Sequence, residues 1–177
     1  MPIGGYIGEM RRSLTIARAS LAFLLICGCT AQLAPAYDQA VSDGLVSANK
    51  DIQALFVAVG TFATKDTYPT RAPAYDHIVA ELEAVELQIK TRPIPNSDVL
   101  QQANTLLAKS GISGISNDPN LSNYPSARSV ADLVKTVQHM QISDRTTGLQ
   151  PNLVLAYENQ ANIYLTQAIT YENFLKR

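Results

Sequence analysis

The sequence predicts an all-α protein, an up-and-down antiparallel bundle of four main helices and one short helix. Successive segments of the 177-residue chain carry apolar residues at alternating spacings of three and four, which place side chains on one face of an α-helix. No segment alternates apolar and polar residues for long enough to indicate a strand. Short connections between the helical segments favour antiparallel neighbours.

The first helix is predicted over residues 37–63. Its apolar stripe consists of Val41, Leu45, Ala48, Ile52, Leu55, Val59 and Phe62. Residues 64–70, which include Pro69, break this helix. The second helix is expected to begin near Pro73, a residue suited to a first turn, and Pro93 and Pro95 end it. Its stripe consists of Tyr75, Ile78, Leu82, Val85 and Ile89, and Glu86 and Lys90 form an i,i+4 ion pair on its solvent face.

A short third helix follows, with Asn96 or Ser97 as its cap and Gly111 as its end. Its stripe consists of Val99, Leu100, Ala103, Leu106 and Leu107. Residues 111–125 form a long loop rich in Gly, Ser, Asn and Pro, and a loop of that length in a small domain is either functional or mobile.

The fourth helix is predicted over residues 126–144, with a stripe of Val130, Leu133, Val137 and Met140. The fifth is predicted from Pro151 to about Leu175, with a stripe of Val154, Tyr157, Ala161, Tyr164, Ala168, Tyr171 and Leu175. We expect the first and last helices to pack on each other, since they are the longest, and Ala48, Ala161 and Ala168 permit a close approach.

Three tyrosines of the fifth helix, Tyr157, Tyr164 and Tyr171, recur every seven residues. The simpler interpretation is that they belong to the core, where each hydroxyl needs a hydrogen-bond partner. The alternative is that they line a groove that accepts a ligand or a peptide.

The segment before the helices has the composition of an export signal. Arg11, Arg12 and Arg18 form a basic region, and the apolar run over residues 19–26 is too short to span a bilayer of about 30 Å. Ile26-Cys27-Gly28-Cys29 resembles the lipobox of bacterial lipoproteins, in which an aliphatic residue and two small residues precede the cysteine that becomes acylated. The resemblance implies a signal peptide over residues 1–28, Cys29 as the lipidated residue and a tether over residues 29–36 before the bundle domain over residues 37–177.

Alternatives to this processing stay open. Cys27 as the acceptor would place Ile26 beside the cleaved bond, where a β-branched residue fits poorly, so Cys29 is favoured. Cleavage later, after Ala36, would instead release a periplasmic protein without lipid. Met10 is an alternative start residue, since it directly precedes Arg11. Thr30 after the lipidated cysteine implies, by the same resemblance, the outer membrane facing the periplasm.

Composition limits the partners and the chemistry. Removal of residues 1–28 leaves 149 residues with a net charge of −3, because it takes away three arginines and Glu9. This mild charge, without a basic run, argues against nucleic acid as a partner. Motifs for a nucleophile elbow, a zinc protease, a phosphate loop, a dinucleotide site or haem attachment are absent, so no cofactor is expected.

For a metal, the candidates are His77 and Glu81, which share a helix face, together with His139 on another helix. Two or three surface residues that meet no ligand are the simpler interpretation. The sequence therefore favours a lipid-anchored envelope protein with a non-enzymatic binding or scaffolding role, attached to the membrane by its lipid and to another envelope protein by its bundle. The alternatives are a small-molecule or metal-binding periplasmic bundle and a membrane-anchored enzyme.

Overall fold

The computed structural model describes residues 37–92, 97–114 and 124–176. Over these ranges the fold is all-α, which confirms the all-α part of the prediction. The helices are α2 (Gln39–Val59), the 3-10 helix η1 (Lys65–Thr70), α3 (Ala72–Lys90), α4 (Ser97–Lys109), α5 (Pro125–Thr146) and α6 (Pro151–Leu175). The predicted signal peptide and tether lie outside the described residues, as do Cys29 and most of the predicted loop over residues 111–125.

Helix α2 is shorter than predicted at both ends. The Asp38 side chain caps its start by accepting a hydrogen bond from the amide of Ala40 at 2.9 Å. Gly60 ends it with a φ of 63°, a left-handed conformation that costs glycine little. The prediction that Phe62 belongs to the core was wrong: the residue follows the end of α2, and half of it is exposed.

The segment predicted only as a break contains η1, whose Pro69 lies inside the 3-10 helix. Helix α3 then begins at Ala72, one residue before the predicted Pro73. Its predicted stripe of five apolar residues is buried throughout. The pair of Glu86 and Lys90 forms as predicted. Helices α5 and α6 follow their predicted ranges, although α5 extends by one residue at its start and two at its end.

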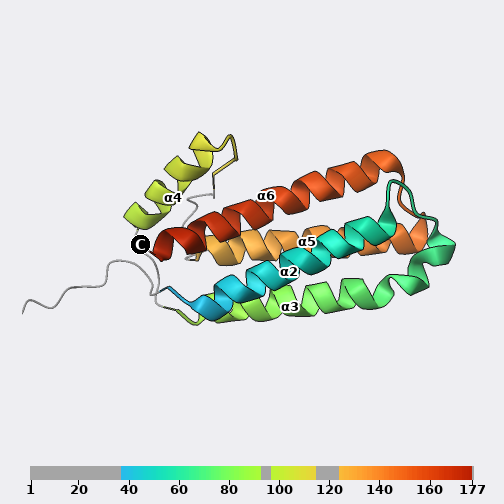
Figure 1. The fold of residues 1–177 in the computed structure, drawn as a ribbon, viewed down its shortest axis with the longest axis horizontal. Coiled ribbons are helices and arrows are strands. Elements are labelled where there is room, and N and C mark those ends of the chain that lie inside the picture. Colours follow the sequence, from blue (N-terminus) through green and yellow to red (C-terminus); the bar gives the residue numbers. More distant parts are fainter. Residues whose placement is uncertain (1–36, 93–96, 115–123, 177) are drawn as a thin grey trace, which may run out of the picture. The chain divides into compact units, whose positions relative to one another are not determined.

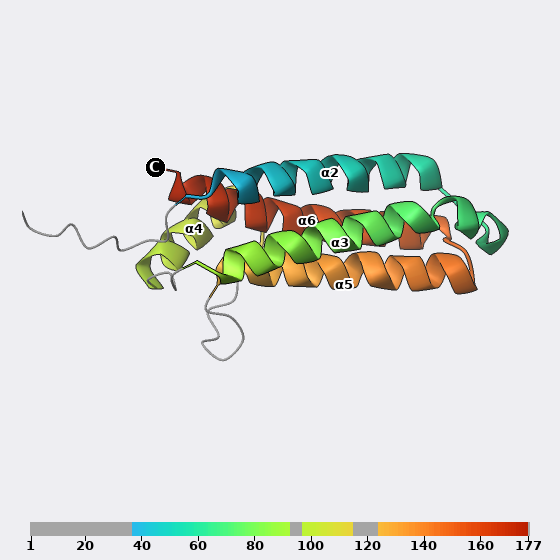
Figure 2. The same ribbon diagram turned by 90° about the horizontal axis from the view of Figure 1, so that it is seen from below.

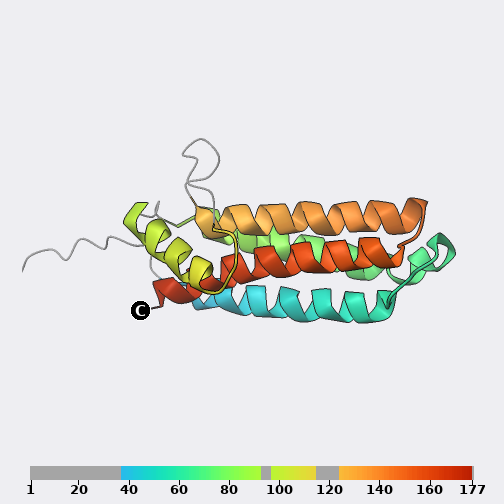
Figure 3. The same cartoon turned by 90° about the horizontal axis from the view of Figure 1, so that it is seen from above.

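Helices α2, α3, α5 and α6 lie side by side, and each contacts two of the others (Figures 1 and 2). Helix α3 packs against α2 and α5, and α6 packs against the same two helices. The predicted contact between the first and last long helices is therefore present. Helix α4 packs against the C-terminal part of α6, at one end of the four long helices (Figure 3).

A β-bridge joins the connection between α2 and η1 to the connection between α5 and α6, at the end of the long helices away from α4. Ala63 and Leu149 exchange backbone hydrogen bonds of 3.0 and 2.7 Å, one residue from each connection. The neighbouring Gly148 has a φ of 75°, and a Cβ atom there would lie 2.5 Å from the carbonyl oxygen of Ala63. Only glycine therefore permits this close approach of the two connections.

A buried ion pair joins η1, α3 and α5 near the bridge. Asp144, with no exposed surface, accepts hydrogen bonds from Nε and Nη2 of Arg71 at 2.8 and 2.6 Å. The hydroxyl of Tyr75 donates to the same carboxylate at 3.1 Å. Burial raises the pKa of Tyr75, and the charge of Asp144 raises it further. The hydrogen bonds that Arg71 donates to Asp144 raise the pKa of Arg71, so the guanidinium stays charged in this site.

A second buried ion pair lies at the opposite end of α3. Arg92 donates to the Glu172 carboxylate on α6 through Nη1 at 2.8 Å and Nη2 at 2.7 Å. Ser126, in the first turn of α5, donates to the same carboxylate. Burial alone would lower the pKa of Arg92, but the hydrogen bond and the charge of Glu172 outweigh it and raise that pKa. The two ion pairs therefore connect three of the long helices at both ends of α3.

Helix α4 and the C-terminal part of α6 form a small apolar cluster. The buried members of this cluster are Ala103, Leu107, Tyr171 and Leu175. The hydroxyl of Tyr171 is buried and has no hydrogen-bond partner among the described residues. Burial raises the pKa of this hydroxyl, and the nearby charge of Glu172 adds to the shift. Over the described ranges, no helix combines the length and the apolar character that crossing a membrane requires.

Candidate functional site

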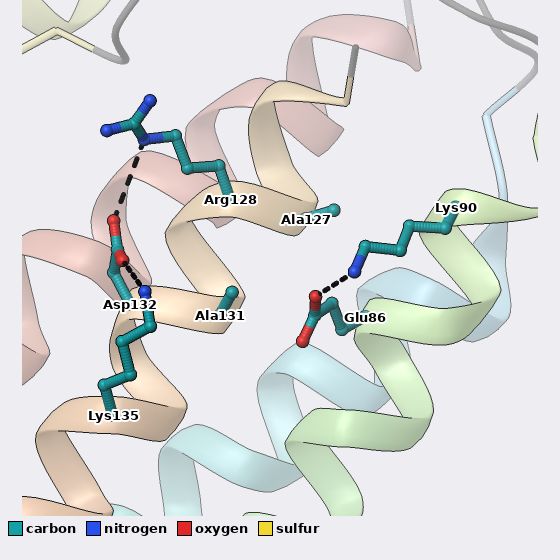
Figure 4. Close-up of a pocket in the computed structure, with 7 residues that line it drawn as sticks. All are labelled: Glu86, Lys90, Ala127, Arg128, Ala131, Asp132 and Lys135. Atoms are coloured by element: carbon teal, nitrogen blue, oxygen red, sulfur yellow. Dashed lines mark hydrogen bonds and ion pairs between the residues drawn. The ribbon is translucent and has the colours of Figure 1, made fainter. Parts of the chain in front are cut away.

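The candidate site is the outer face of α5, which is bordered by a surface hollow on each side. The first hollow lies between α3 and α5 and has a volume of about 180 Å³. Ala127 and Ala131 leave space for it because their side chains end at Cβ. The pair of Glu86 and Lys90 from α3 faces Ala127 and Ala131, and Arg128, Asp132 and Lys135 lie on the far side of these alanines (Figure 4). The complete lining consists of Glu86, Lys90, Ala127, Arg128, Ala131, Asp132 and Lys135.

The second hollow lies between α5 and α6 and has a volume of about 400 Å³. Helix α5 contributes charged and polar side chains to it, and α6 contributes two tyrosines, one glutamine and one alanine. The lining consists of Asp132, Lys135, Thr136, His139, Ala156, Tyr157, Gln160 and Tyr164. This is a mixed surface, in which aromatic rings provide contact area and polar groups provide orientation.

Asp132 and Lys135 line both hollows, so the two form one continuous surface along α5. We call this the α5 surface. Lys135 donates a hydrogen bond to Asp132 Oδ1 at 3.1 Å, and Arg128 Nε lies 3.8 Å from Oδ2 (Figure 4). One carboxylate thus faces two cations, which leaves an excess of positive charge at this place. Arg128 Nη1 is buried without a hydrogen-bond partner among the described residues.

The three tyrosines predicted as a groove have different positions. Tyr157 and Tyr164 line the second hollow, whereas Tyr171 is buried beneath α4 and lies outside it. The Tyr157 hydroxyl donates to the carbonyl oxygen of His139 at 3.3 Å and lies 2.9 Å from the Ser143 hydroxyl, which can donate to it. These contacts fix the Tyr157 ring at the edge of the hollow. Whether the hollow accepts a ligand stays a prediction.

The three metal candidates are also divided between two places. His77 and Glu81, on α3, lie beside Asp51 of α2, and one ligand atom from each residue lies within 4.8 Å of the other two. His139 belongs to the α5 surface instead. Asp51 was absent from the sequence prediction, because spacing along one helix carries no information about the residues of a neighbouring helix.

Comparison of the chain with known protein families, curated proteins and solved structures found no match.

Proposed function

We propose that the protein is anchored to a bacterial cell envelope by lipid on Cys29 and binds another envelope component, without catalysis, through the α5 surface. The observation that carries the binding role is the larger hollow between α5 and α6, where Tyr157 and Tyr164 lie beside Lys135 and His139. Tyrosine combines a large contact area with few rotatable bonds, so it binds partners at low entropic cost.

The lipid anchor is supported by the sequence Ile26-Cys27-Gly28-Cys29, which resembles a lipobox, after a basic region and a short apolar run. Seven residues separate Cys29 from Tyr37, the first described residue, so the tether between lipid and helices is short. One acyl chain alone holds a protein only marginally. The lipoprotein resemblance implies two or three chains, which would make release from the membrane slow.

The finer architecture also belongs to this proposal. We describe α2, α3, α5 and α6 as an up-and-down antiparallel bundle and α4 as a short addition to it. The connection from α5 to α6 spans residues 147–150, and this short length supports the topology, whereas α3 and α5 are joined through α4. Apolar side chains of these four helices fill the core, so the binding site that we propose is an outer one, the α5 surface. The sequence lacks the motifs for hydrolysis and phosphate binding, and this absence supports the non-enzymatic role.

Site-specific photo-crosslinking in the bacterial host tests the binding role. A photoreactive residue at Ala156, an exposed position that lines the larger hollow, should capture an envelope component. The same residue at Val57, an exposed position on α2, is the control and should not capture that component. Equal capture of the same component from both positions would contradict the proposal.

A second pair of variants tests the tyrosines. Tyr164→Ala removes a ring that lines the hollow, and it should abolish the crosslink formed from Ala156. Leu155→Ala changes an exposed residue of the same helix outside the hollow, and the crosslink should persist. Thermal unfolding of both variants establishes that the bundle is still folded. A crosslink unaffected by Tyr164→Ala in a folded protein would exclude the hollow as the binding site.

A further inference from the structure

Three side chains of types that commonly bind metals, from Asp51, His77 and Glu81, meet at the outer edge of the contact between α2 and α3. Nε2 of His77 lies 3.2 Å from Oδ2 of Asp51. Glu81, one helical turn after His77, places a carboxylate oxygen within 4.8 Å of both. The i,i+4 spacing on α3 aligns His77 and Glu81 on one face, and Asp51 approaches from α2.

The distances suit a single small ion. Bonds of about 2.0–2.2 Å from nitrogen and carboxylate oxygen place two ligands of a tetrahedral ion about 3.3–3.6 Å apart. The pair of His77 and Asp51 already has nearly this separation. Glu81 needs a displacement of up to roughly 1.5 Å, which rotations about its side-chain bonds provide.

The charge of the cluster also favours a cation. Two carboxylates approach each other here, and neither forms an ion pair with a lysine or arginine in the part of the chain that the structure describes. Among the described residues, the basic side chain in contact with them is the imidazole of His77, which is two-thirds exposed. A divalent ion would neutralise both carboxylates at once.

Glu81 supplies an independent observation. Its Oε2 atom is buried and has no hydrogen-bond partner within the described residues, although the residue as a whole is partly exposed. A buried acceptor without a partner is uncommon in folded proteins and needs an explanation such as a bound ion. Coordination of a metal would provide this carboxylate with the partner that the protein itself does not supply.

We propose that Asp51, His77 and Glu81 bind one divalent transition-metal ion, with Zn²⁺ as the best match to one imidazole and two carboxylates. Imidazole selects zinc and the neighbouring transition metals over Mg²⁺ and Ca²⁺, which prefer oxygen ligands alone. Three protein ligands leave the fourth position of a tetrahedral ion to water or to an outside ligand. The ion would also join α2 to α3 and stabilise their contact.

Zinc titration of the full-length protein, stripped of metal by EDTA and held in detergent, tests this site. Calorimetry with Zn²⁺ should detect one ion per chain. His77→Ala, Asp51→Asn and Glu81→Gln should each raise the Kd for Zn²⁺ by at least about tenfold. The control is His139→Ala, which removes the other histidine of the chain and should leave the Kd unchanged.

Nuclear magnetic resonance of the imidazole groups gives a direct second readout. The chain has two histidines, so Zn²⁺ should shift the imidazole signals of His77 and leave those of His139 unchanged. The affected residues are exposed or partly exposed, and circular dichroism should show that each variant keeps its helices. Absence of Zn²⁺ binding, binding that survives the carboxylate substitutions, or binding that is lost in His139→Ala would overturn the proposal.

Discussion

Replacement of Asp144 by alanine tests whether the buried ion pair holds η1, α3 and α5 together. The substitution leaves the buried guanidinium of Arg71 without its partner and removes the acceptor of the Tyr75 hydroxyl. Breaking a buried ion pair by removing one partner costs about 3–5 kcal/mol. Arg71 keeps a hydrogen bond to Thr67 at 2.9 Å and one to the carbonyl oxygen of Thr64 at 3.3 Å, which favours the lower part of this range.

We therefore expect Asp144→Ala to lower the free energy of unfolding by about 3–4 kcal/mol. For a domain of this size, that loss corresponds to a fall in Tm of roughly 10 °C. Urea unfolding followed by far-UV circular dichroism measures the free energy, and a thermal scan measures the Tm. Asp132→Ala is the control: its partly exposed carboxylate pairs with Lys135 and Arg128 of the same helix, so the loss should stay below about 1 kcal/mol.

The double variant Arg71→Met with Asp144→Leu tests whether an uncompensated buried charge causes this loss. If the cost comes from an uncompensated buried charge, the double variant should be more stable than Asp144→Ala, because apolar side chains replace both charges. A cost of Asp144→Ala no greater than that of Asp132→Ala would contradict a stabilising role for the buried ion pair. A double variant that is the least stable of the three proteins would contradict an uncompensated charge as the cause.

The remaining predictions concern the tyrosines and the glycines. Burial raises the pKa of the Tyr75 and Tyr171 hydroxyls above the usual value. The unfolded chain releases the two hydroxyl protons near pH 10, whereas the folded protein keeps them. The free energy of unfolding should therefore fall as the pH rises above about 10. Urea unfolding across alkaline pH measures this fall, and a flat profile would contradict it. Tyr171→Phe removes a buried hydroxyl without a partner and should leave the free energy of unfolding unchanged or raise it. Tyr75→Phe loses a hydrogen bond to a carboxylate and should lower that free energy by about 1.5–3 kcal/mol. The same loss for both variants in urea unfolding would be inconsistent with these contacts. Gly148→Ala should destabilise the protein more than Gly60→Ala in thermal scans, because both have positive φ but only Gly148 would place a Cβ against the Ala63 carbonyl; equal losses would mean that this contact relaxes freely.

Apolar spacing predicted the helices because the stripes coincide with the faces that pack together. Four of the predicted helices have buried stripes close to those expected, and the exception at Phe62 follows from Gly60, whose left-handed conformation ends α2 early. Phe62 was assigned to the stripe because it stands three residues after Val59, which fits helical spacing although the helix has already ended.

The buried charges were missed, although the sequence contains a signal for them. Asp144 continues the spacing of Val137 and Met140 on α5, and Arg71 stands four residues before Tyr75 on the stripe of α3. Opposite charges that each fall in register with an apolar stripe indicate a buried pair. Apolar patterns alone do not reveal this, because they assign every charged residue to the solvent.

The candidate sites depend on contacts between helices, which spacing along one helix does not determine. His77 and Glu81 share a face of α3, as their spacing predicted, but their approach to Asp51 depends on how far α2 and α3 are shifted along each other. In the same way, Tyr157 and Tyr164 line a hollow, whereas Tyr171, seven residues further, is covered by α4. A sequence repeat does not indicate where a neighbouring helix begins to cover it.

Intact-mass measurement of the protein recovered from the cells that produce it tests the proposed anchoring most directly. The proposal predicts a chain that begins at Cys29 and carries the added mass of acyl chains, and a Cys29→Ser variant that is neither processed there nor acylated. An unacylated chain that begins after Cys29 would contradict it.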